Sequence, residues 1–304
     1  MIIIRLQGGL GNQLYEYAMY KKFQMLGKEV YLDDTDYTDR AKFPDIRDLE
    51  LTYFDSLSYD LCSIGQREKL VDDKRTFFAR ARRKIFGDYS KIFREKKDYM
   101  PEVFEEDDKY LIGWWNCEKY YEDMIPFLQK EIIFPKRYND KTKLLLEKLN
   151  GSKNTVSIHI RLGDYVTKAS TYGNICTDAY YQAAIKYIKN HVENPQFYLF
   201  SDDPKGAMQM LVNIMPEAES ICQVVDWNTG KDSMYDMLIQ SRCAHNICAN
   251  STFSMWGARL NQNPDKIMIR SLKHDNNQHF TPEYMMQMWK NWTLIDEKGN
   301  IYGR

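Results

Sequence analysis

The sequence predicts an α/β protein of two lobes, and three observations support that prediction. Residues 155–269 alternate between short apolar strand patterns and amphipathic helix patterns, which is typical of a parallel sheet covered by helices on both faces. The chain also opens with a strand, a glycine loop, a helix and a second strand. Its 304 residues are roughly twice the ~150 expected of one domain, so each lobe can bury its own core.

The first lobe begins with a βαβ unit. Residues 2–6 are apolar and β-branched, the glycine-rich run 8–12 follows, and a helical pattern extends over 13–26 until Gly27 ends it. Residues 29–33 form the second strand. The glycine loop therefore lies at the carboxyl end of a parallel strand, where its amides can approach an anion at the helix start. A tight strand-to-helix turn is the alternative that involves no ligand.

The glycine loop also matches part of a dinucleotide-binding fingerprint. Gly9 and Gly11 are followed by the acidic Asp33 about 20 residues later, but Leu14 stands where the third glycine belongs. An NAD-dependent oxidoreductase is therefore the alternative enzyme class.

The region 35–137 is less regular and contains a basic run over 67–97. We interpret this run as a solvated helix face, with an anionic acceptor or the inner membrane surface as the alternative partner. The polar stretch 135–154 predicts the passage between the lobes. We therefore divide the chain into an amino-terminal acceptor-side domain, 1–150, and a carboxyl-terminal Rossmann-like domain, 151–304.

The second lobe follows in regular alternation. We expect strands over 155–160, 197–200, 221–225, 246–249 and 266–269, and helices over 177–192, 204–215, 232–243 and 252–260. Polar clusters follow three of these strands, at 159–165, 201–204 and 250–254. Carboxyl ends of parallel strands share one edge of a sheet, so the three clusters converge on one ligand site.

Composition narrows the function classes. Lysine and arginine total 42 against 43 acidic residues, so the whole-chain charge does not steer the protein toward nucleic acid. No run approaches the ~18 apolar residues of a spanning helix, and Arg5 follows the apolar start at once, which favours a buried strand over a signal peptide and a cytoplasmic location. The six cysteines lack paired spacing, so we expect reduced thiols and no metal site.

Arg161 is the leading candidate for anion binding. It alternates with His159 at the end of an apolar strand, so both side chains should point to one side of the sheet. A guanidinium is a planar fork of donors suited to a diphosphate, and it stabilises the charge that a leaving diphosphate gains. The alternative is an ion pair between Arg161 and Asp164 that only braces the loop.

The remaining candidates each have a structural alternative. Asp203 before Pro204 suits an N-cap and first helical residue. Asp236 is either a solvated helical acid or the partner of a guanine base. Ser251 and Thr252 either cap a helix or contribute hydroxyls and amides to a phosphate site.

Together these motifs resemble the inverting α-1,2-fucosyltransferases of glycosyltransferase family 11. The resemblance covers nearly the whole chain, and its motifs are the residues 4–14, 113–115, 159–166, 180–185, 200–203, Asp236, 245–247 and 249–258.

The resemblance implies a GT-B fold, in which two Rossmann-like lobes face each other across a cleft. It implies that GDP-β-L-fucose is the donor substrate and that no cofactor or metal takes part. It also implies that fucose is transferred with inversion, in an α-1,2 linkage, to the 2-hydroxyl of a terminal galactose in an oligosaccharide. Arg161 would bind the diphosphate, with His159 and Asp236 near the nucleoside. The residues expected to bind GDP-fucose are Arg161, His159, Gly11, Asn12, Asp203, Asp236, Asn250, Ser251, Thr252 and Phe253.

Three positions depart from the family pattern. Leu162 replaces a second arginine, which leaves Arg161 as the only guanidinium of its loop, and Met255 replaces a tryptophan. Glu16 stands where relatives carry glutamine and becomes a candidate base.

The expected reaction is a single displacement in which the acceptor hydroxyl attacks the anomeric carbon. A general base contributes ~10²–10⁴-fold, and Asp164 is the leading candidate, followed by His159, so the expected catalytic residues are Asp164, His159 and Arg161. The alternatives from other classes are the NAD-dependent oxidoreductase and a non-catalytic sugar-binding protein. We expect no nucleic-acid partner, and a peripheral contact with the inner membrane surface is the alternative that the basic run 67–97 leaves open.

Overall fold

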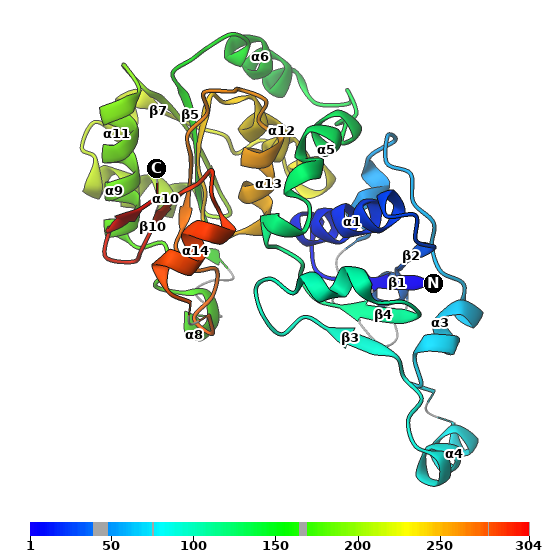
Figure 1. Cartoon of the computed structure of the whole chain (residues 1–304). Coiled ribbons are helices and arrows are strands. Elements are labelled where there is room, and N and C mark those ends of the chain that lie inside the picture. The colour runs from blue at the N-terminus through cyan, green and yellow to red at the C-terminus, as the bar shows by residue number, and fades with distance from the viewer. Residues whose placement is uncertain (39–47, 75, 164–168, 279, 304) are drawn as a thin grey trace. The chain divides into compact units, whose positions relative to one another are not determined.

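The structure is a computed structural model that describes residues 1–38, 48–74, 76–163, 169–278 and 280–303. The chain divides into two compact units, Met1–Pro126 and Phe127–Arg304 (Figure 1). This division falls before the polar stretch that the sequence marks as the passage near residue 150. The physical reason is that Leu145 and Leu149, within that stretch, pack against Tyr198 and Phe200 of the second unit's sheet.

The first unit is built on four parallel strands in the order β2-β1-β4-β3 among its described residues. Their bounds are β1 Ile2–Arg5, β2 Val30–Asp33, β3 Ile92–Arg94 and β4 Lys109–Ile112. Its helices are α1 Leu10–Met25, α2 Thr35–Thr38, α3 Ile64–Leu70 and α4 Phe77–Phe86, with short 3-10 turns η1 Glu50–Tyr53, η2 Pro101–Glu105, η3 Glu118–Tyr120 and η4 Glu122–Met124. The predicted opening βαβ unit is therefore present as β1, α1 and β2.

The second unit contains a seven-stranded sheet among its described residues, in the order β11-β10-β9-β8-β5-β6-β7. All neighbouring strands are parallel except β10 and β11. The strands are β5 Thr155–Ile160, β6 Gln196–Ser201, β7 Cys222–Val224, β8 His245–Ile247, β9 Met268–Ser271, β10 Thr293–Ile295 and β11 Ile301–Tyr302.

Helices connect these strands. α5 Ile125–Glu131 begins at the boundary between the units, and the others are α6 Asp140–Leu149, α8 Ala169–Tyr172, α9 Asp178–His191, α10 Pro204–Ile214, α11 Ala218–Ile221, η5 Gly230–Ser233, α12 Met234–Arg242, α13 Thr252–Leu260 and α14 Pro282–Met288. Every residue of β5 is buried, as expected of a central strand covered on both faces. Val156, Ile158 and Ile160 pack in one core with Tyr181 of α9 and Leu211 of α10.

The predicted fold class, a GT-B-type α/β protein with two Rossmann-like lobes, is confirmed, since each unit contains its own parallel sheet. Each strand and helix expected between 155 and 269 is present within a few residues of its expected bounds. Among the residues that the structure describes, no helix is long and apolar enough to cross a membrane.

Candidate functional site

The candidate site of the second unit lies where the order of its strands reverses. The chain passes from β5 outward to β6 and β7, and then returns to the other side of β5 for β8 and β9. The loops after β5 and β8 therefore leave in opposite directions and open a crevice at the carboxyl edge of the sheet, the usual ligand site of open α/β sheets. Arg161 follows β5, and Asn250, Ser251 and Thr252 follow β8. The predicted convergence of these loops is present.

Arg161 is held by an acid that the sequence analysis did not assign. Its Nε lies 3.1 Å from Oδ2 of Asp202, at the end of the neighbouring strand β6. The same carboxylate accepts hydrogen bonds from the amides of Leu162 at 2.9 Å and Gly163 at 3.0 Å. Asp202 thus fixes both the guanidinium and the backbone of the loop. A signal existed in the sequence, because Asp202 directly follows β6 as Arg161 directly follows β5.

Asp164, the leading candidate for the base, lies outside the described residues. The alternative ion pair between Arg161 and Asp164 therefore also lies outside the described residues. The carboxylate that the structure shows beside Arg161 is that of Asp202.

His159 is buried and uncharged at neutral pH. Burial, reinforced by the nearby Arg161 charge and opposed by Asp202, lowers the pKa of His159 to about 3. Its Nδ1 is buried without a hydrogen-bond partner in the described structure. Its ring centroid lies 6.2 Å from that of Phe253, in the first turn of α13. A neutral imidazole with a pKa this low is a weak proton acceptor, so it is better suited to hydrogen bonding than to base catalysis.

The amino terminus of α13 has no side-chain cap. Its N-cap residue Ser251 makes no capping hydrogen bond, whereas Thr177 caps α9 and Asp203 caps α10 through side-chain oxygens. The first amides of a nine-residue helix, with their positive end of the helix dipole, therefore remain directed at the carboxyl edge of the sheet. Ser251 therefore does not fill the capping role, and its role in phosphate binding, which uncapped amides favour, stays a prediction.

Asn250 holds the loop after β8 in place. Its Nδ2 donates to the carbonyl oxygens of Tyr172 at 3.2 Å and His274 at 3.0 Å, and the residue is 1% exposed. Asn250 and Arg161 line one hollow of about 940 Å³, together with Leu162 and Gly206. That volume is within the ~300–1,000 Å³ range of small-molecule sites.

Two buried tyrosines of α9 hold this edge of the sheet through hydrogen bonds to its backbone. The hydroxyl of Tyr181 donates to the carbonyl of His159 at 2.9 Å, and that of Tyr180 donates to the carbonyl of Cys248 at 2.6 Å. These hydrogen bonds satisfy backbone carbonyls at the ends of β5 and β8, which fixes the two strands that carry the site.

Two other predicted residues lie outside the Arg161 cluster. Asp203 accepts the amide of Gly206 at 3.1 Å, which is the N-cap role that the sequence offered as its alternative. Asp236 is in the first turn of α12, where its Oδ1 accepts a hydrogen bond from Asn228 at 2.8 Å. Burial, together with the charge of Asp226, raises the pKa of Asp236 to about 7 even though the Asn228 hydrogen bond lowers it.

The glycine loop of the first unit contains predicted residues Gly11 and Asn12. Both are in the first turn of α1, whose N-cap Gly9 provides no side-chain cap. The amide of Leu10 is nonetheless occupied, because it donates to Oε2 of Glu50 at 2.5 Å. A carboxylate at this helix start takes the place that a phosphate would fill. The phosphate-binding role of Gly11 and Asn12 therefore stays a prediction that this contact does not favour.

Glu16, the candidate base at a departure from the family pattern, is wholly buried. Its Oε2 accepts the amide of Gln7 at 2.9 Å, and its Oε1 is buried without a hydrogen-bond partner. Burial raises the pKa of Glu16 well above its ordinary value, although hydrogen bonds from Gln7 oppose the shift. Its carboxyl group does not reach the surface of its unit.

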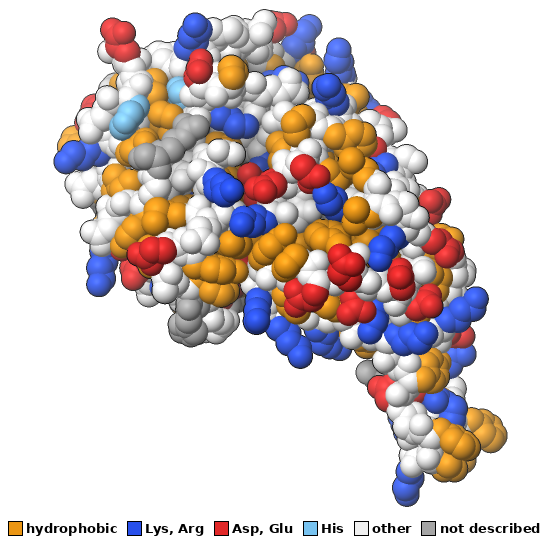
Figure 2. Space-filling view, viewed as in Figure 1, with side chains coloured by type: hydrophobic (Ala, Val, Ile, Leu, Met, Phe, Trp, Pro, Cys, Tyr) orange, Lys and Arg blue, Asp and Glu red, His pale blue; other side chains and the backbone are white. Residues whose placement is uncertain are grey.

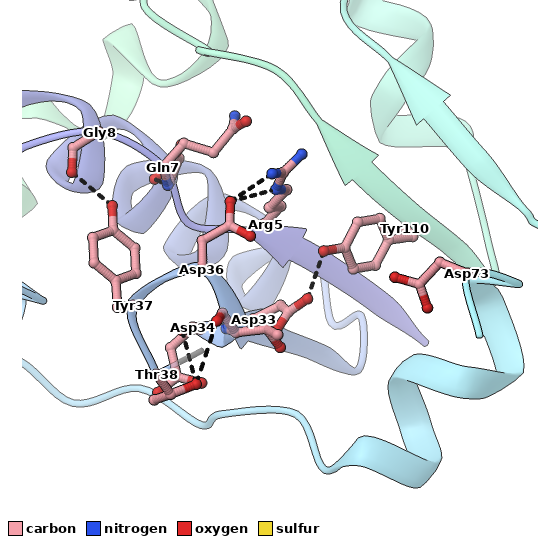
Figure 3. A network of polar contacts seen from close by, with 12 residues as sticks. Arg5, Gln7, Gly8, Asp33, Asp34, Asp36, Tyr37, Thr38, Asp73 and Tyr110 are labelled. Carbon is pink, nitrogen blue, oxygen red and sulfur yellow. Dashed lines mark hydrogen bonds and ion pairs between the residues drawn. The ribbon is translucent and has the colours of Figure 1, made fainter. Parts of the chain in front are cut away.

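Asp33, the acid in the dinucleotide fingerprint, is fully engaged within its own unit. Oδ1 accepts a hydrogen bond from the amide of Thr35 at 3.0 Å, and Oδ2 accepts one from Nε of Arg67 at 3.0 Å. Oδ2 also accepts a hydrogen bond from the hydroxyl of Tyr110 at 2.5 Å (Figure 3). Only 2% of the residue is exposed. A ribose hydroxyl therefore has no free carboxylate oxygen to bind here, which argues against the NAD-dependent alternative.

The strand order of the first unit also reverses, between β1 and β4. The side chain of Gln7, after β1, donates to the carbonyl of Gly113, after β4, at 3.1 Å. Beside this bridge, Trp115 is fully buried and Trp114 is 48% exposed. Glu95 holds the pair by accepting both tryptophan amides, at 2.7 and 3.0 Å. An exposed indole at a carboxyl edge is suited to pack against the apolar face of a sugar.

The family model for Glycosyl transferase family 11 matches residues 77–296 of the chain. The chain belongs to glycosyl transferase family 11. This family 11 enzyme is 32% identical over 293 residues to the O-antigen biosynthesis glycosyltransferase WbnK of Escherichia coli, an alignment that covers 88% of this chain and 93% of that protein. It is 30% identical over 267 residues to an alpha-1,2-colitosyltransferase of Escherichia coli, which covers 86% and 87%.

A more distant relative is the galactoside 2-alpha-L-fucosyltransferase Sec1 of Mus musculus. It is 21% identical over 269 residues, which cover 86% of this chain and 64% of that protein. Among solved structures, the fucosyltransferase NodZ from Bradyrhizobium is similar with a TM-score of 0.44 and 13% identity, over 84% of this chain and 92% of that one. Because the chain belongs to a glycosyltransferase family, the transferase prediction is favoured over the two alternatives from other classes, the NAD-dependent oxidoreductase and the non-catalytic sugar-binding protein.

Proposed function

We propose that this family 11 glycosyltransferase moves L-fucose from GDP-fucose to the 2-hydroxyl of a terminal galactose, with inversion at the anomeric carbon. One observation carries the proposal most strongly. Arg161 and the uncapped start of α13 lie on the two sides of the crevice where the strand order reverses. A cation and a free helix amino terminus in this position are suited to a nucleoside diphosphate.

In the proposed reaction, the second unit stabilises the leaving group. As the bond from the anomeric carbon to the diphosphate oxygen breaks, negative charge grows on GDP. The guanidinium of Arg161 and the first amides of α13, with Ser251 and Thr252, would bind that charge more tightly in the transition state than in the substrate. Asp202 keeps the guanidinium in place throughout. These residues supply the stabilisation that a metal supplies in other transferases.

Asp236 is the proposed partner of the guanine base. An ionised carboxylate can accept both the N1–H and the amino group of guanine. Because burial disfavours the ionised form in the free protein, binding of guanine would restore a charge that folding penalises.

This role gives Asp236→Asn two opposite effects. Between its ordinary pKa of 3.8 and the folded value of about 7, the folded state holds a proton that the unfolded state has released, so stability falls as pH rises through this window. The neutral amide avoids that penalty. We expect Asp236→Asn to raise the free energy of unfolding by on the order of 2 kcal/mol near pH 8, with a smaller gain near pH 5.5, and to weaken GDP binding about tenfold or more.

Denaturant unfolding at both pH values and calorimetric titration with GDP measure these effects. The exposed Asp265→Asn carries the same chemical change at the opposite edge of the sheet and should alter neither quantity. An Asp236→Asn protein with unchanged GDP affinity would remove Asp236 from the nucleoside site.

The donor sugar and the acceptor are tested by a GDP-release assay. A relative at 30% identity is named a colitosyltransferase, and colitose is fucose without its 3-hydroxyl, so GDP-fucose and GDP-colitose are the two donors to compare. We expect GDP release with GDP-fucose and galactosides, and a product with fucose α-linked to O2 by NMR. Faster turnover of GDP-colitose would change the donor, whereas a β-linked product would contradict inversion.

A further inference from the structure

The helix α4 exposes its apolar side chains to solvent. None of its residues is buried, and Phe77, Phe78, Ile85 and Phe86 are 78%, 83%, 73% and 80% exposed. Figure 2 shows hydrophobic side chains gathered at the place that α4 occupies in Figure 1. Soluble proteins rarely expose large apolar side chains as a contiguous group unless something covers them.

The sequence of α4 gathers most of its apolar side chains on one side, with basic side chains at its borders. With 3.6 residues per turn, Phe77, Phe78 and Ile85 fall on one side of the helix together with Ala81. Lys84 falls beside Phe77 at one border of this side, Arg80 lies further round the helix, and both are exposed, whereas Phe86 falls on the opposite side. The helix contains no acidic residue. This is the pattern of a helix that lies flat on a lipid surface, with its apolar side in the acyl boundary and its cations at the headgroups.

Polar contacts of Arg82 and Arg83 hold α4 in place and leave its apolar side uncovered. Arg82 and Arg83 both pair with the carboxylate of Asp72, and Arg83 also donates to the carbonyl of Lys74 at 2.7 Å. The guanidinium of Arg82 lies 4.5 Å from the ring centroid of Tyr89. The orientation of the helix is thus fixed from its basic side, so the exposure of the phenylalanines is a consequence of the fold.

We infer that α4 docks this protein on an anionic phospholipid surface. Charge complementarity selects this occupant, because exposed Arg80 and Lys84 flank the apolar side and each basic residue near an anionic leaflet adds attraction. A second copy of the chain is a poorer partner, because a twofold contact between two α4 helices would bring their cations together. The inference does not depend on which sugar or acceptor the enzyme uses.

Co-sedimentation of the full chain with vesicles tests the inference. We expect binding to vesicles of phosphatidylcholine with phosphatidylglycerol, little binding to phosphatidylcholine alone, and loss of binding as salt is added. Phe78→Ser with Ile85→Ser should lower the partition coefficient about tenfold or more, because two large apolar side chains leave the acyl boundary. Arg80→Glu with Lys84→Glu should lower it at least about fivefold per charge.

Two matched pairs serve as controls. Ile133→Ser with Leu144→Ser removes apolar side chains that are 59% and 65% exposed in the second unit, and Lys143→Glu with Lys186→Glu reverses two exposed charges there. Both pairs should keep wild-type vesicle binding, and thermal unfolding of every variant verifies that it is folded. The inference is overturned if the wild-type chain ignores anionic vesicles or if the α4 variants bind them as well as the controls do. A wild-type dimer that Phe78→Ser with Ile85→Ser converts to monomer would instead assign α4 to a second copy.

Discussion

Arg161→Lys is expected to lower kcat/KM by about 10²–10⁴-fold, with most of the loss in kcat. Lysine keeps the positive charge but loses the planar fork that makes two charge-assisted hydrogen bonds, each contributing about 1.5–3 kcal/mol. The loss falls on kcat because these bonds strengthen as the diphosphate leaves. Steady-state kinetics with GDP-fucose and a galactoside measure the change, and calorimetric titration measures the parallel loss of GDP affinity.

The competing interpretation is that Arg161 only braces its loop through Asp202, 3.1 Å away. A brace would lower thermal stability and leave the chemistry of the folded enzyme intact. The exposed Arg242→Lys, on α12, is the matched control and should leave kcat unchanged. If Arg161→Lys keeps wild-type kcat and GDP affinity, the diphosphate site lies elsewhere and the proposed mechanism fails.

Asp164→Asn is expected to lower kcat by about 10²–10⁴-fold while GDP binding stays near the wild-type value. Asp164 follows Arg161 by three positions in the chain, and the proposed mechanism assigns it the proton of the attacking hydroxyl. The asparagine side chain is of similar size but cannot take a proton. Single-turnover rates with bound GDP-fucose isolate the chemical step from substrate binding and product release.

The pH dependence of kcat separates a base from a group that only positions the sugar. A base gives a rate that rises with pH until the carboxyl group is ionised, and the asparagine variant should lose this rise. Asp265→Asn is again the matched control, because it is exposed at the opposite edge of the sheet. If Asp164→Asn keeps near-full turnover, Asp164 is not the general base, and another group of the site must take the proton. The pKa of about 3 makes His159 a weak candidate there.

Trp114 and Trp115 are adjacent in the chain but differ in exposure. The indole is 48% exposed, and Glu95 fixes the backbone of Trp114 and Trp115. Either tryptophan could, by residue type alone, pack in the core or against a sugar. The structure separates the two roles, because Trp115 packs inside and only Trp114 offers its ring to a ligand.

Periodicity by itself determined the architecture of the second unit. The alternation from 155 to 269 predicted β5 to β9 and the helices between them, because apolar spacing depends only on local geometry and burial. The same alternation placed the residues after β5 and β8 at one edge of a sheet. Arg161 and Ser251 could therefore be predicted as ligand-binding residues from the sequence alone.

Tertiary structure alone decided which polar groups remain available to a ligand. Asp202 was visible in the sequence, but only the pairing of β5 with β6 brings it to Arg161. Likewise, Asp33 matched a cofactor fingerprint until Arg67 and Tyr110, distant along the chain, were seen to occupy its carboxylate. Local spacing specifies helices and strands, whereas the hydrogen-bond partners of a buried acid come from other segments, and no local pattern encodes them.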